Sequence, residues 1–375
     1  MAMLPLKYGV SYSGPRGTLD QGGAYVVAYA HDGSVLVQHG GVEVGQGIQT
    51  KMAQITAETL DIPLHLIKMG PTDTNVISDA SPTAASTGSD LNGGAVELAC
   101  RQLRERLEKF CEDLEQYTVY FSKFDPTVMD EVTNRQIETV TRNWRDHWSD
   151  LWSTIVSLAY INRINLASEA RYKMPHYSAV DIAHTIGKPF FYFTTGVGYS
   201  EVEIDVLTGD YTLLRSDILF DIGKSLNPLI DVGQIEGAFI QGVGYVTFEE
   251  LLLQGPVQAP RQGYPEGALT STNTWDYKPP GTKSIPLDMR VKIVDNSGCE
   301  LQHPGPKLDM AAVKSSKGIG EPPLVLGNSV FFAIKQAILA FYQDQGYDGW
   351  VEMDAPATVQ RIQSACRVTR DDLKL

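Results

Sequence analysis

The stretch AYVVAYAHDGSVLVQHGGVEVGQGIQTKMAQITAETL, which spans residues 24–60, predicts a β-hairpin, a glycine-rich turn and a helix in succession. Two apolar runs flank HDGS, and an Asp-Gly pair between such runs is a strong signal for a hairpin. The glycines stop at Gly47, and the apolar residues after it recur at the spacing of one helix face: Ile48, Met52, Ile55 and Leu60.

The same order recurs later in the chain. VEIDV, the turn LTGD and YTLLRSDILFDIG predict a second hairpin over residues 202–223, and a helix is expected to open at about Gly233. Gln46 in GQG and Gln234 in GQIEG occupy corresponding places, which indicates a weak internal repeat. The alternative is that hairpin–helix units are common and that these two are unrelated.

The predicted fold class is α+β, with two related hairpin-plus-helix units. At roughly 150 residues per domain, the length of 375 residues allows two or three packed units. We expect a first domain at 1–180, with a polar insertion near 115–143, and a second domain at 181–375.

A long helix is expected between the two hairpin units. Ser89 or Asp90 is placed to cap it, and its pattern continues past Leu107. Three tryptophans further on follow the spacing of one helix face, and such a stripe is typical of packing: Trp144, Trp148 and Trp152.

Two runs of small residues, GGVEVGQG (40–47) and SPTAASTG (81–88), each precede a predicted helix. Small residues let a ligand approach the backbone, and the N–H groups at a helix N-terminus favour anions. Neither run is a dinucleotide fingerprint or contains a lysine placed for a phosphate. We expect an anionic or polar cofactor held by backbone and amide groups, with tight structural turns as the equally weighted alternative.

Glu321 is the one carboxylate in KGIGEPPLVLG, residues 317–327, where it follows a glycine and precedes two prolines. Pro322 suits the first helical turn because its missing N–H needs no partner there. The prolines fix the backbone, and a helix N-terminus stabilises negative charge. A rigid, ionised carboxylate suits a general base. The alternative is that glutamate is simply common in first turns.

The composition argues against several classes of partner. The net charge is −14 and no basic run occurs, so nucleic acids and anionic membranes are poor partners. No apolar run is expected to approach ~20 residues and the N-terminus resembles no signal peptide, so we expect neither a membrane span nor secretion. Scattered histidines and widely spaced cysteines predict no disulfide, zinc or iron–sulfur site within the chain. A cytoplasmic location is the default expectation, with a peroxisomal one as the alternative.

Five motifs, in their order and spacing, resemble the molybdenum-cofactor domain of xanthine dehydrogenases and aldehyde oxidases. They are HGGVEVGQGIQTKMAQI, SDASPTAASTGSDLNGGAV, SEVEIDVLTGDY, SLNPLIDVGQIEGAFIQGVGYVTFEEL and KGIGEPPLVLGNSVFFAIKQAI. The resemblance covers nearly the whole chain except about 115–143, and it extends only to the C-terminal half of that domain. TFEEL and YKPPGTKSIP favour xanthine dehydrogenase, with aldehyde oxidase as the closest alternative.

The resemblance implies a molybdenum–molybdopterin cofactor whose metal is held by the pterin and not by protein ligands. It places the catalytic base at Glu321 and the substrate contacts at Tyr12 and Ser13. Val44, where methionine is common, and a longer loop at 13–23 depart from the family and leave the shape of the pocket open. The implied cofactor-contacting residues are Gly45, Gln46, Gly47, Ala84, Ala85 (near the metal), Ser86, Gln234 and Gly320.

The implied reaction is hydroxylation of a purine carbon, in hypoxanthine or xanthine, with water as the oxygen source. The alternatives are oxidation of aldehydes or other N-heterocycles, and a folded fragment or scaffold without cofactor. FAD and 2Fe-2S clusters are expected in modules outside this chain, and those modules are its expected partners. The complete enzyme is expected to be a homodimer, and the isolated chain to be inactive.

Overall fold

The computed structural model of the chain describes residues 1–12, 18–121, 131–174, 178–181, 186–255, 264–294 and 312–368. Its mixture of helices and open sheets confirms the α+β fold class. Within the described ranges there are two compact units, each built from several segments of the chain. The predicted domains, 1–180 and 181–375, are continuous in sequence and stay a prediction. Unit 1 contains Met1–Tyr8, Phe193–His303 and Ile319–Leu375, and unit 2 contains Gly9–Tyr192 and Pro304–Gly318.

Unit 2 contains the first predicted hairpin. Strands β2 and β3 are antiparallel, with Val26 opposite Val37. The sheet order is β4-β3-β2-β5, in which β4 is parallel to β3 and β5 is antiparallel to β2. The strands are β2 (Gln21–Ala28), β3 (Val35–His39), β4 (Ile67–Met69) and β5 (Ala167–Lys173).

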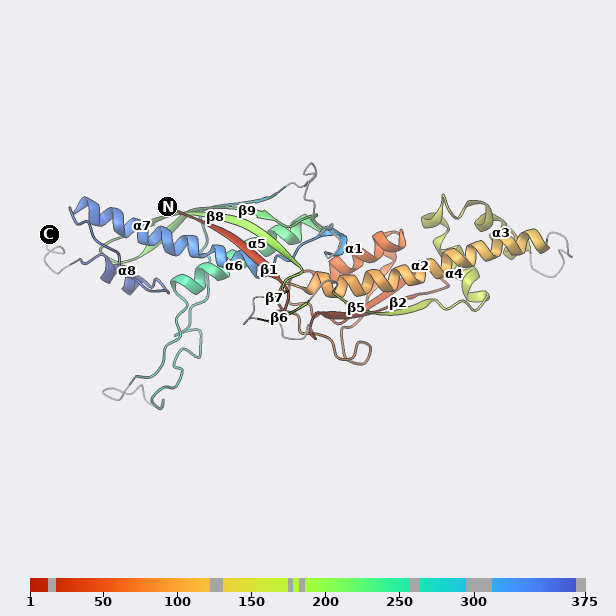
Figure 1. Ribbon diagram of the computed structural model, residues 1–375, viewed down its shortest axis with the longest axis horizontal. Helices are drawn as coiled ribbons and strands as arrows, with labels where there is room; N and C mark the ends of the chain where they lie inside the picture. The colour runs from red at the N-terminus through yellow and green to blue at the C-terminus, as the bar shows by residue number, and fades with distance from the viewer. Residues whose placement is uncertain are drawn as a thin grey trace. The chain divides into compact units, whose positions relative to one another are not determined.

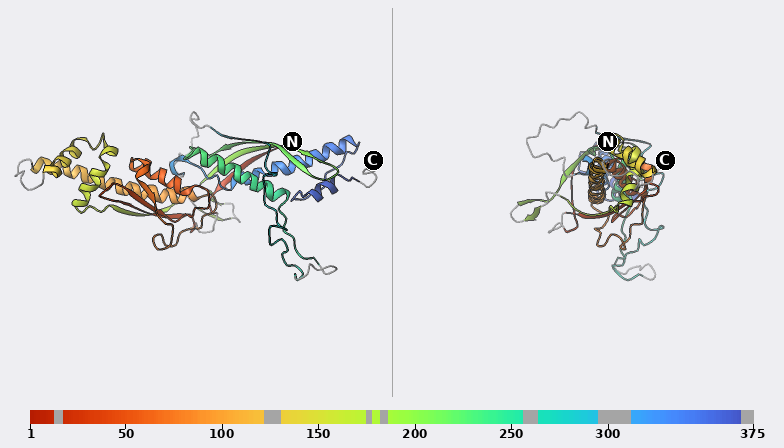
Figure 2. Two further views of the ribbon diagram at one scale, coloured as in Figure 1. Left: turned by 180° about the vertical axis from the view of Figure 1, so that it is seen from behind. Right: turned by 90° about the vertical axis from the view of Figure 1, so that its right-hand side faces the viewer.

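Helices α1 and α2 bury the apolar face of this sheet. α2 lies along β2 and β5, as Figure 1 and the view from behind in Figure 2 show, and α1 contacts α2. Val26 and Val37 of the sheet, Ile55 of α1 and Leu103 of α2 are fully buried, and each such side chain contributes roughly 1.5–3 kcal/mol. The other elements of unit 2, with these helices, are α1 (Ile48–Leu60), η1 (Leu64–Leu66), α2 (Gly88–Phe121), α3 (Glu131–Asn143), α4 (Trp148–Ile161), β6 (Ser178–Asp181), β7 (Ile186–Lys188) and η4 (Val313–Ser315).

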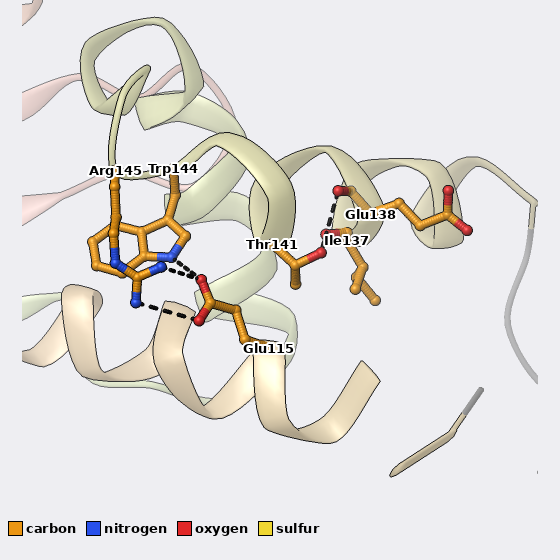
Figure 3. A network of polar contacts seen from close by, with 6 residues as sticks. All are labelled: Glu115, Ile137, Glu138, Thr141, Trp144 and Arg145. Atoms are coloured by element: carbon orange, nitrogen blue, oxygen red, sulfur yellow. Dashed lines mark hydrogen bonds and ion pairs between the residues drawn. The ribbon is translucent and has the colours of Figure 1, made fainter. Parts of the chain in front are cut away.

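A tryptophan cluster joins α2 to the turn between α3 and α4. The ring of Trp148 lies 6.1 Å from that of Trp144 and 6.0 Å from that of Trp152. Figure 3 shows Glu115 Oε1 accepting hydrogen bonds from Trp144 Nε1 at 2.6 Å and from Arg145 at 2.5 Å. The guanidinium of Arg145 holds the pKa of the Glu115 carboxyl below its usual range. The predicted packing role is confirmed, although Trp144 precedes α4.

Unit 1 contains the second predicted hairpin. Strands β8 and β9 are antiparallel, with a bulge between Glu201 and Val202, and β10 is parallel to β9. The sheet order is β1-β8-β9-β10. Phe220 of β9, Phe239 of α5 and Ile334 of α7 are fully buried in its core. The elements are β1 (Ala2–Val10), β8 (Tyr192–Ile204), β9 (Tyr211–Asp221), α5 (Pro228–Thr247), β10 (Asp288–Ile293), α6 (Pro322–Leu326), α7 (Asn328–Asp344) and α8 (Val359–Ala365).

Helix α5 begins at Pro228, so the predicted start at about Gly233 is wrong. The side chain of Asn227 accepts a hydrogen bond from the Ile230 N–H, and the proline occupies the first turn. Both are strong helix-start signals, and they outweigh the glycine. Gln234 therefore lies inside the helix rather than at its mouth, and the geometric correspondence with Gln46, which precedes α1, fails.

Helix α2 begins at Gly88, so Ser89 and Asp90 lie in its first turn and neither is the cap. The side chain of Asp90 is buried instead, with 2% of the residue exposed. The prediction that this helix continues past Leu107 is confirmed, because α2 has 34 residues.

Glycines bring α5 into backbone contact with α6 and with the residue that follows it. A Cβ on Gly242 would lie 2.0 Å from the carbonyl oxygen of Leu324. A Cβ on Gly327 would lie 2.4 Å from the carbonyl carbon of Gly242. Ordinary carbon contacts lie near 3.5–4.0 Å, so only glycine fits at these two positions without a backbone shift.

The helical stretch Pro322–Asp344 has 23 residues, and an 18-residue window within it has a mean hydropathy of 1.7. It is therefore long and apolar enough to cross a membrane by length and composition alone. The sequence-based expectation of no such stretch overlooked it. Val330, Ile334 and Ile338 on this stretch are buried in the core of unit 1, as in the core helix of a globular unit.

Candidate functional site

The predicted site residues divide between the two units. Unit 2 contains Tyr12, the turn at 40–47 and the loop at 81–88. Unit 1 contains Gln234, Gly320 and Glu321. Ser13 lies outside the described residues.

The turn before α1 closes around the carboxylate of Glu43. Glu43 Oε1 accepts the N–H groups of Gly45 at 3.0 Å and Gly47 at 2.9 Å, and Oε2 accepts that of Gln49 at 3.1 Å. Desolvation raises the pKa of Glu43, but these backbone hydrogen bonds together outweigh it and hold the pKa below its usual value. The sequence predicts these N–H groups to face a ligand, but here they are donated to Glu43, which the sequence reasoning missed.

Gln46 is bonded to its own turn at both ends of its amide. Its Nε2 donates to the carbonyl oxygen of Val42 at 2.7 Å, and its Oε1 accepts the Val44 N–H at 2.7 Å. The structure therefore gives Gln46 a turn-stabilising role, which was the alternative left open by the sequence. Its contact with a cofactor stays a prediction.

His39 supports the same turn from the buried side. The Gly41 N–H donates to its Nδ1 at 3.1 Å, which puts the ring proton on Nε2, 3.2 Å from Gln49 Oε1. Burial lowers the pKa of this imidazole, so His39 is neutral near pH 7.

The loop at 81–88 is hydrogen-bonded to that turn. The Val42 N–H donates to Thr83 Oγ1 at 2.9 Å. Ala85 and Ser86 both have φ of 56°, in the left-handed region that non-glycine residues rarely adopt. A narrow cleft opens beside the loop at the N-terminus of α2, and small residues line much of it, including Gly22, Gly40, Ser81 and Gly88.

Tyr12 is hydrogen-bonded to the loop at 81–88. Its hydroxyl donates a hydrogen bond to the carbonyl oxygen of Pro82, and its N–H donates to Asp20 Oδ1 at 3.1 Å. Burial raises the pKa of Asp20, which is 1% exposed. Within unit 2, three stretches far apart in sequence are thus brought together: Tyr12, the turn at 40–47 and the loop at 81–88.

Glu321 stands where the sequence places it, at the N-cap of α6 with prolines in the first turn. It is exposed, and its Oε2 accepts a hydrogen bond from the hydroxyl of Tyr8 at 2.8 Å. Burial, and then this hydrogen bond, raise the pKa of Tyr8 well above its ordinary value, so Tyr8 stays a donor at physiological pH. The two residues are 313 positions apart, and no sequence pattern indicated the pair.

Gln234 lies in the second turn of α5, partly buried. On the same helix, Gly233 and Gly237 are exposed, and a Cβ on either would meet no atom within 4 Å. The helix surface beside Gln234 is therefore bare backbone, which leaves room for a ligand to approach.

The two sets of residues offer different chemistry. Unit 2 offers binding groups: an anion-holding turn, a cleft of small residues and a helix N-terminus. Unit 1 offers a carboxylate with a fixed donor, which can accept a proton. Among the described residues, no group of three His, Cys, Asp or Glu side chains could hold a metal ion.

Comparison of the sequence with known families gives a clear match. The profile described as the molybdopterin cofactor-binding domain matches residues 1–286. A xanthine dehydrogenase from Drosophila pseudoobscura pseudoobscura is 41% identical over 98% of this chain and 23% of its own length. A xanthine dehydrogenase/oxidase from Gallus gallus is 40% identical over the same shares of both chains. The chain thus spans about a quarter of the length of these relatives.

Solved structures show the same fold at low sequence identity. Quinoline 2-oxidoreductase from Pseudomonas putida 86 matches 98% of this chain and 42% of its own, with a TM-score of 0.67 and 19% identity. A CO dehydrogenase from Oligotropha carboxidovorans matches 98% of this chain and 40% of its own, with a TM-score of 0.67 and 17% identity.

Proposed function

Since the chain belongs to the family of molybdopterin cofactor-binding domains, we propose that it is the molybdopterin-binding part of a xanthine-dehydrogenase-like oxidoreductase. The relatives are much longer than this chain, so the activity proposed is that of a longer protein. The reaction is hydroxylation of a purine carbon, with water as the oxygen source and Glu321 as the general base.

The main structural support is the convergence in unit 2. The turn at 40–47, the loop at 81–88 and Tyr12 are joined by the Val42–Thr83 and Tyr12–Pro82 hydrogen bonds. The turn and the loop belong to motifs on which the family resemblance rests, and Tyr12 is a predicted substrate contact.

The residues present fit a cofactor of this kind. Gly45, like Gly233 and Gly237, has nothing within 4 Å of the position a Cβ would take. The N–H groups of Gly45 and Gly47 are donated to the Glu43 carboxylate, so an anionic group of the cofactor would bind them only by displacing that carboxylate. The residues proposed to hold the cofactor are Gly45, Gln46, Gly47, Ala84, Ala85, Ser86, Gln234 and Gly320.

When bound, the molybdenum cofactor would supply the two-electron redox chemistry that no side chain of this unit offers. The net reaction is R–H + H₂O → R–OH + 2H⁺ + 2e⁻. The role proposed for Glu321 is to take a proton from the water-derived oxygen at its carboxylate. Tyr8 donates to Oε2 throughout and so orients the carboxylate without competing for the proton.

Several parts of the proposal concern the complete enzyme. The substrate is a purine, with aldehydes or other N-heterocycles as the alternative class. FAD and 2Fe-2S clusters belong to modules outside this chain, and the enzyme acts as a homodimer in the cytoplasm. A non-catalytic scaffold without cofactor is the contrary outcome.

The test is molybdenum content, measured by elemental analysis on the native species recovered with an antibody to this chain. We expect about one molybdenum per chain, in a species far larger than 41.2 kDa. A species of this size without molybdenum would refute the proposal and leave the scaffold.

The base is tested in that complete enzyme by Glu321→Gln. We expect unchanged molybdenum content and a loss of at least ~10² in turnover of xanthine. Glu203→Gln, an exposed glutamate on β8, is the matched control and should keep full turnover. Near-normal turnover in Glu321→Gln would remove Glu321 from the mechanism, and a preference for benzaldehyde over xanthine would favour the alternative substrate class.

A further inference from the structure

A buried carboxylate in unit 2 has no part in the proposed reaction. Asp90 lies in the first turn of α2 and is 2% exposed. The hydroxyl of Tyr192 donates to its Oδ2 at 2.6 Å, and the backbone N–H of Val313 also donates to the carboxylate. Losing either of these hydrogen bonds is costly, because it leaves a buried polar group without a partner.

Tyr192 extends this network to a second point of the same segment. The N–H of Gly318 donates to the phenol oxygen of Tyr192 at 2.8 Å, so the phenol accepts from Gly318 while it donates to Asp90. The segment Val313–Gly318 is therefore tied to Asp90 at one end directly and at the other through Tyr192. Between these ends, Lys314 Nζ lies 3.4 Å from Glu58 Oε1.

The segment is pressed against the loop at 81–88. A Cβ on Gly318 would lie 2.6 Å from the carbonyl oxygen of Ser86 and 3.2 Å from its Cβ, so the two backbones are in direct contact. Left-handed backbone occurs on both sides, at Ser86 (φ 56°), Lys314 (φ 52°) and Ser315 (φ 62°). Conformations of this kind persist only where surrounding contacts hold them.

We propose that Asp90 is a positioning residue, which through Tyr192 holds Val313–Gly318 against Ser86 and so fixes the shape of the loop at 81–88. The importance of that loop for a cofactor rests on the proposed function, but the positioning itself does not. Tyr172 provides a matched control. Its ring packs against Gly94, and burial and then the charge of Asp90 raise its pKa, but the Gly318 N–H donates to Tyr192 instead.

The first test is amide hydrogen exchange on this chain, read for peptides covering 313–318 and 81–88. In Tyr192→Phe, which keeps the ring and removes the hydroxyl, we expect exchange at Gly318 to be about tenfold faster, with faster exchange in 81–88 as well. Asp90→Ala should reproduce the effect, and Asp90→Asn, which keeps an acceptor oxygen, should restore part of the protection. Tyr172→Phe should exchange like the unmodified chain.

Equal protection of Gly318 in Tyr192→Phe and the unmodified chain would overturn the inference, whether or not the Asp90 variants fold. So would equal acceleration in Tyr172→Phe, because the effect would then be general loosening. In the complete enzyme, we expect Tyr192→Phe to retain several-fold less molybdenum than Tyr172→Phe. Absence of molybdenum from the unmodified enzyme would refute the proposed function, while the exchange result on this chain would still decide the role of Asp90.

Discussion

Replacing Gly327 by alanine isolates the steric effect of one methyl group between two helices. Gly327 has φ of −56° and ψ of −24°, an ordinary helical conformation that alanine adopts without strain. By intrinsic propensity alone, alanine would stabilise a helix by roughly 1 kcal/mol relative to glycine. Any loss of stability in Gly327→Ala therefore comes from what the new Cβ meets.

The atoms nearest to the added Cβ are all backbone atoms of α5. It would lie 2.4 Å from the carbonyl carbon of Gly242, 2.6 Å from the Val243 nitrogen and 2.8 Å from the Gly242 Cα. Relief requires a movement of about 1 Å between α5 and the α6–α7 stretch, because no flexible side chain can yield. Overpacking of this kind costs ~1–3 kcal/mol or more, so we expect a net loss of about 2 kcal/mol after the propensity gain.

The measurement is the free energy of opening from amide exchange in α5 and α7. A local readout is preferable because a chain with two compact units need not unfold in one step. Gly237→Ala is the matched control: it lies on α5 with open space around the new Cβ and should be neutral or stabilising by up to about 1 kcal/mol. A Gly327→Ala chain as stable as the unmodified one, or equal losses in both variants, would refute the steric account.

Three further predictions follow from the polar groups. Glu43→Ala removes the carboxylate that caps the turn before α1 and should cost about 1 kcal/mol of α1 stability near pH 7. Because the folded pKa of Glu43 is lowered, the difference from the unmodified chain should vanish as the pH falls below 4.5, measured by exchange in 48–60. Asp90, which faces Lys51, Tyr172 and Tyr192, has its pKa raised from 3.8 to about 7 by burial, so its contribution is fully present below pH 3.8 and is lost as the pH rises through 7. The unfolding free energy of Asp90→Asn relative to the unmodified chain should therefore rise by on the order of 2 kcal/mol between pH 5 and 8, and a flat difference would contradict this. Tyr8→Phe removes the donor to Glu321 and should lower turnover of the complete enzyme about tenfold at unchanged molybdenum content, whereas unchanged turnover would show that the carboxylate is oriented by other contacts.

Local patterns in the sequence predicted the elements and the position of Glu321 well. The hairpins depend on turn residues and alternation close in sequence, and the prolines after Glu321 define the start of α6. The start of α5 is also predictable from the sequence, because Asn227 and Pro228 supply a cap and a first-turn proline, and these signals outweigh Gly233.

The hydrogen-bond partners of Asp90 and Glu321 could not be predicted from the sequence. Tyr192 is bonded to Asp90 across 102 residues, and Tyr8 to Glu321 across 313. Such pairs are set by tertiary packing, which no local pattern encodes. Glu43 is a different case, since its three bonds lie within six residues and an acidic residue before a glycine-rich turn could have indicated a self-filled anion site.

Each unit is built from segments far apart in the sequence, and this has a consequence for synthesis of the chain. Strand β1 pairs with β8, and Tyr8 of β1 is bonded to Glu321, so this strand is made well before the residues that it contacts. At about 5–20 residues per second, Tyr8 is added to the chain roughly 15–60 s before Glu321. Until β8 (Tyr192–Ile204) has been made, β1 lacks its neighbour in the sheet, and unpaired strands are open to pairing with other chains. Nascent chains stalled before residue 192 should therefore be the ones that chaperones hold longest.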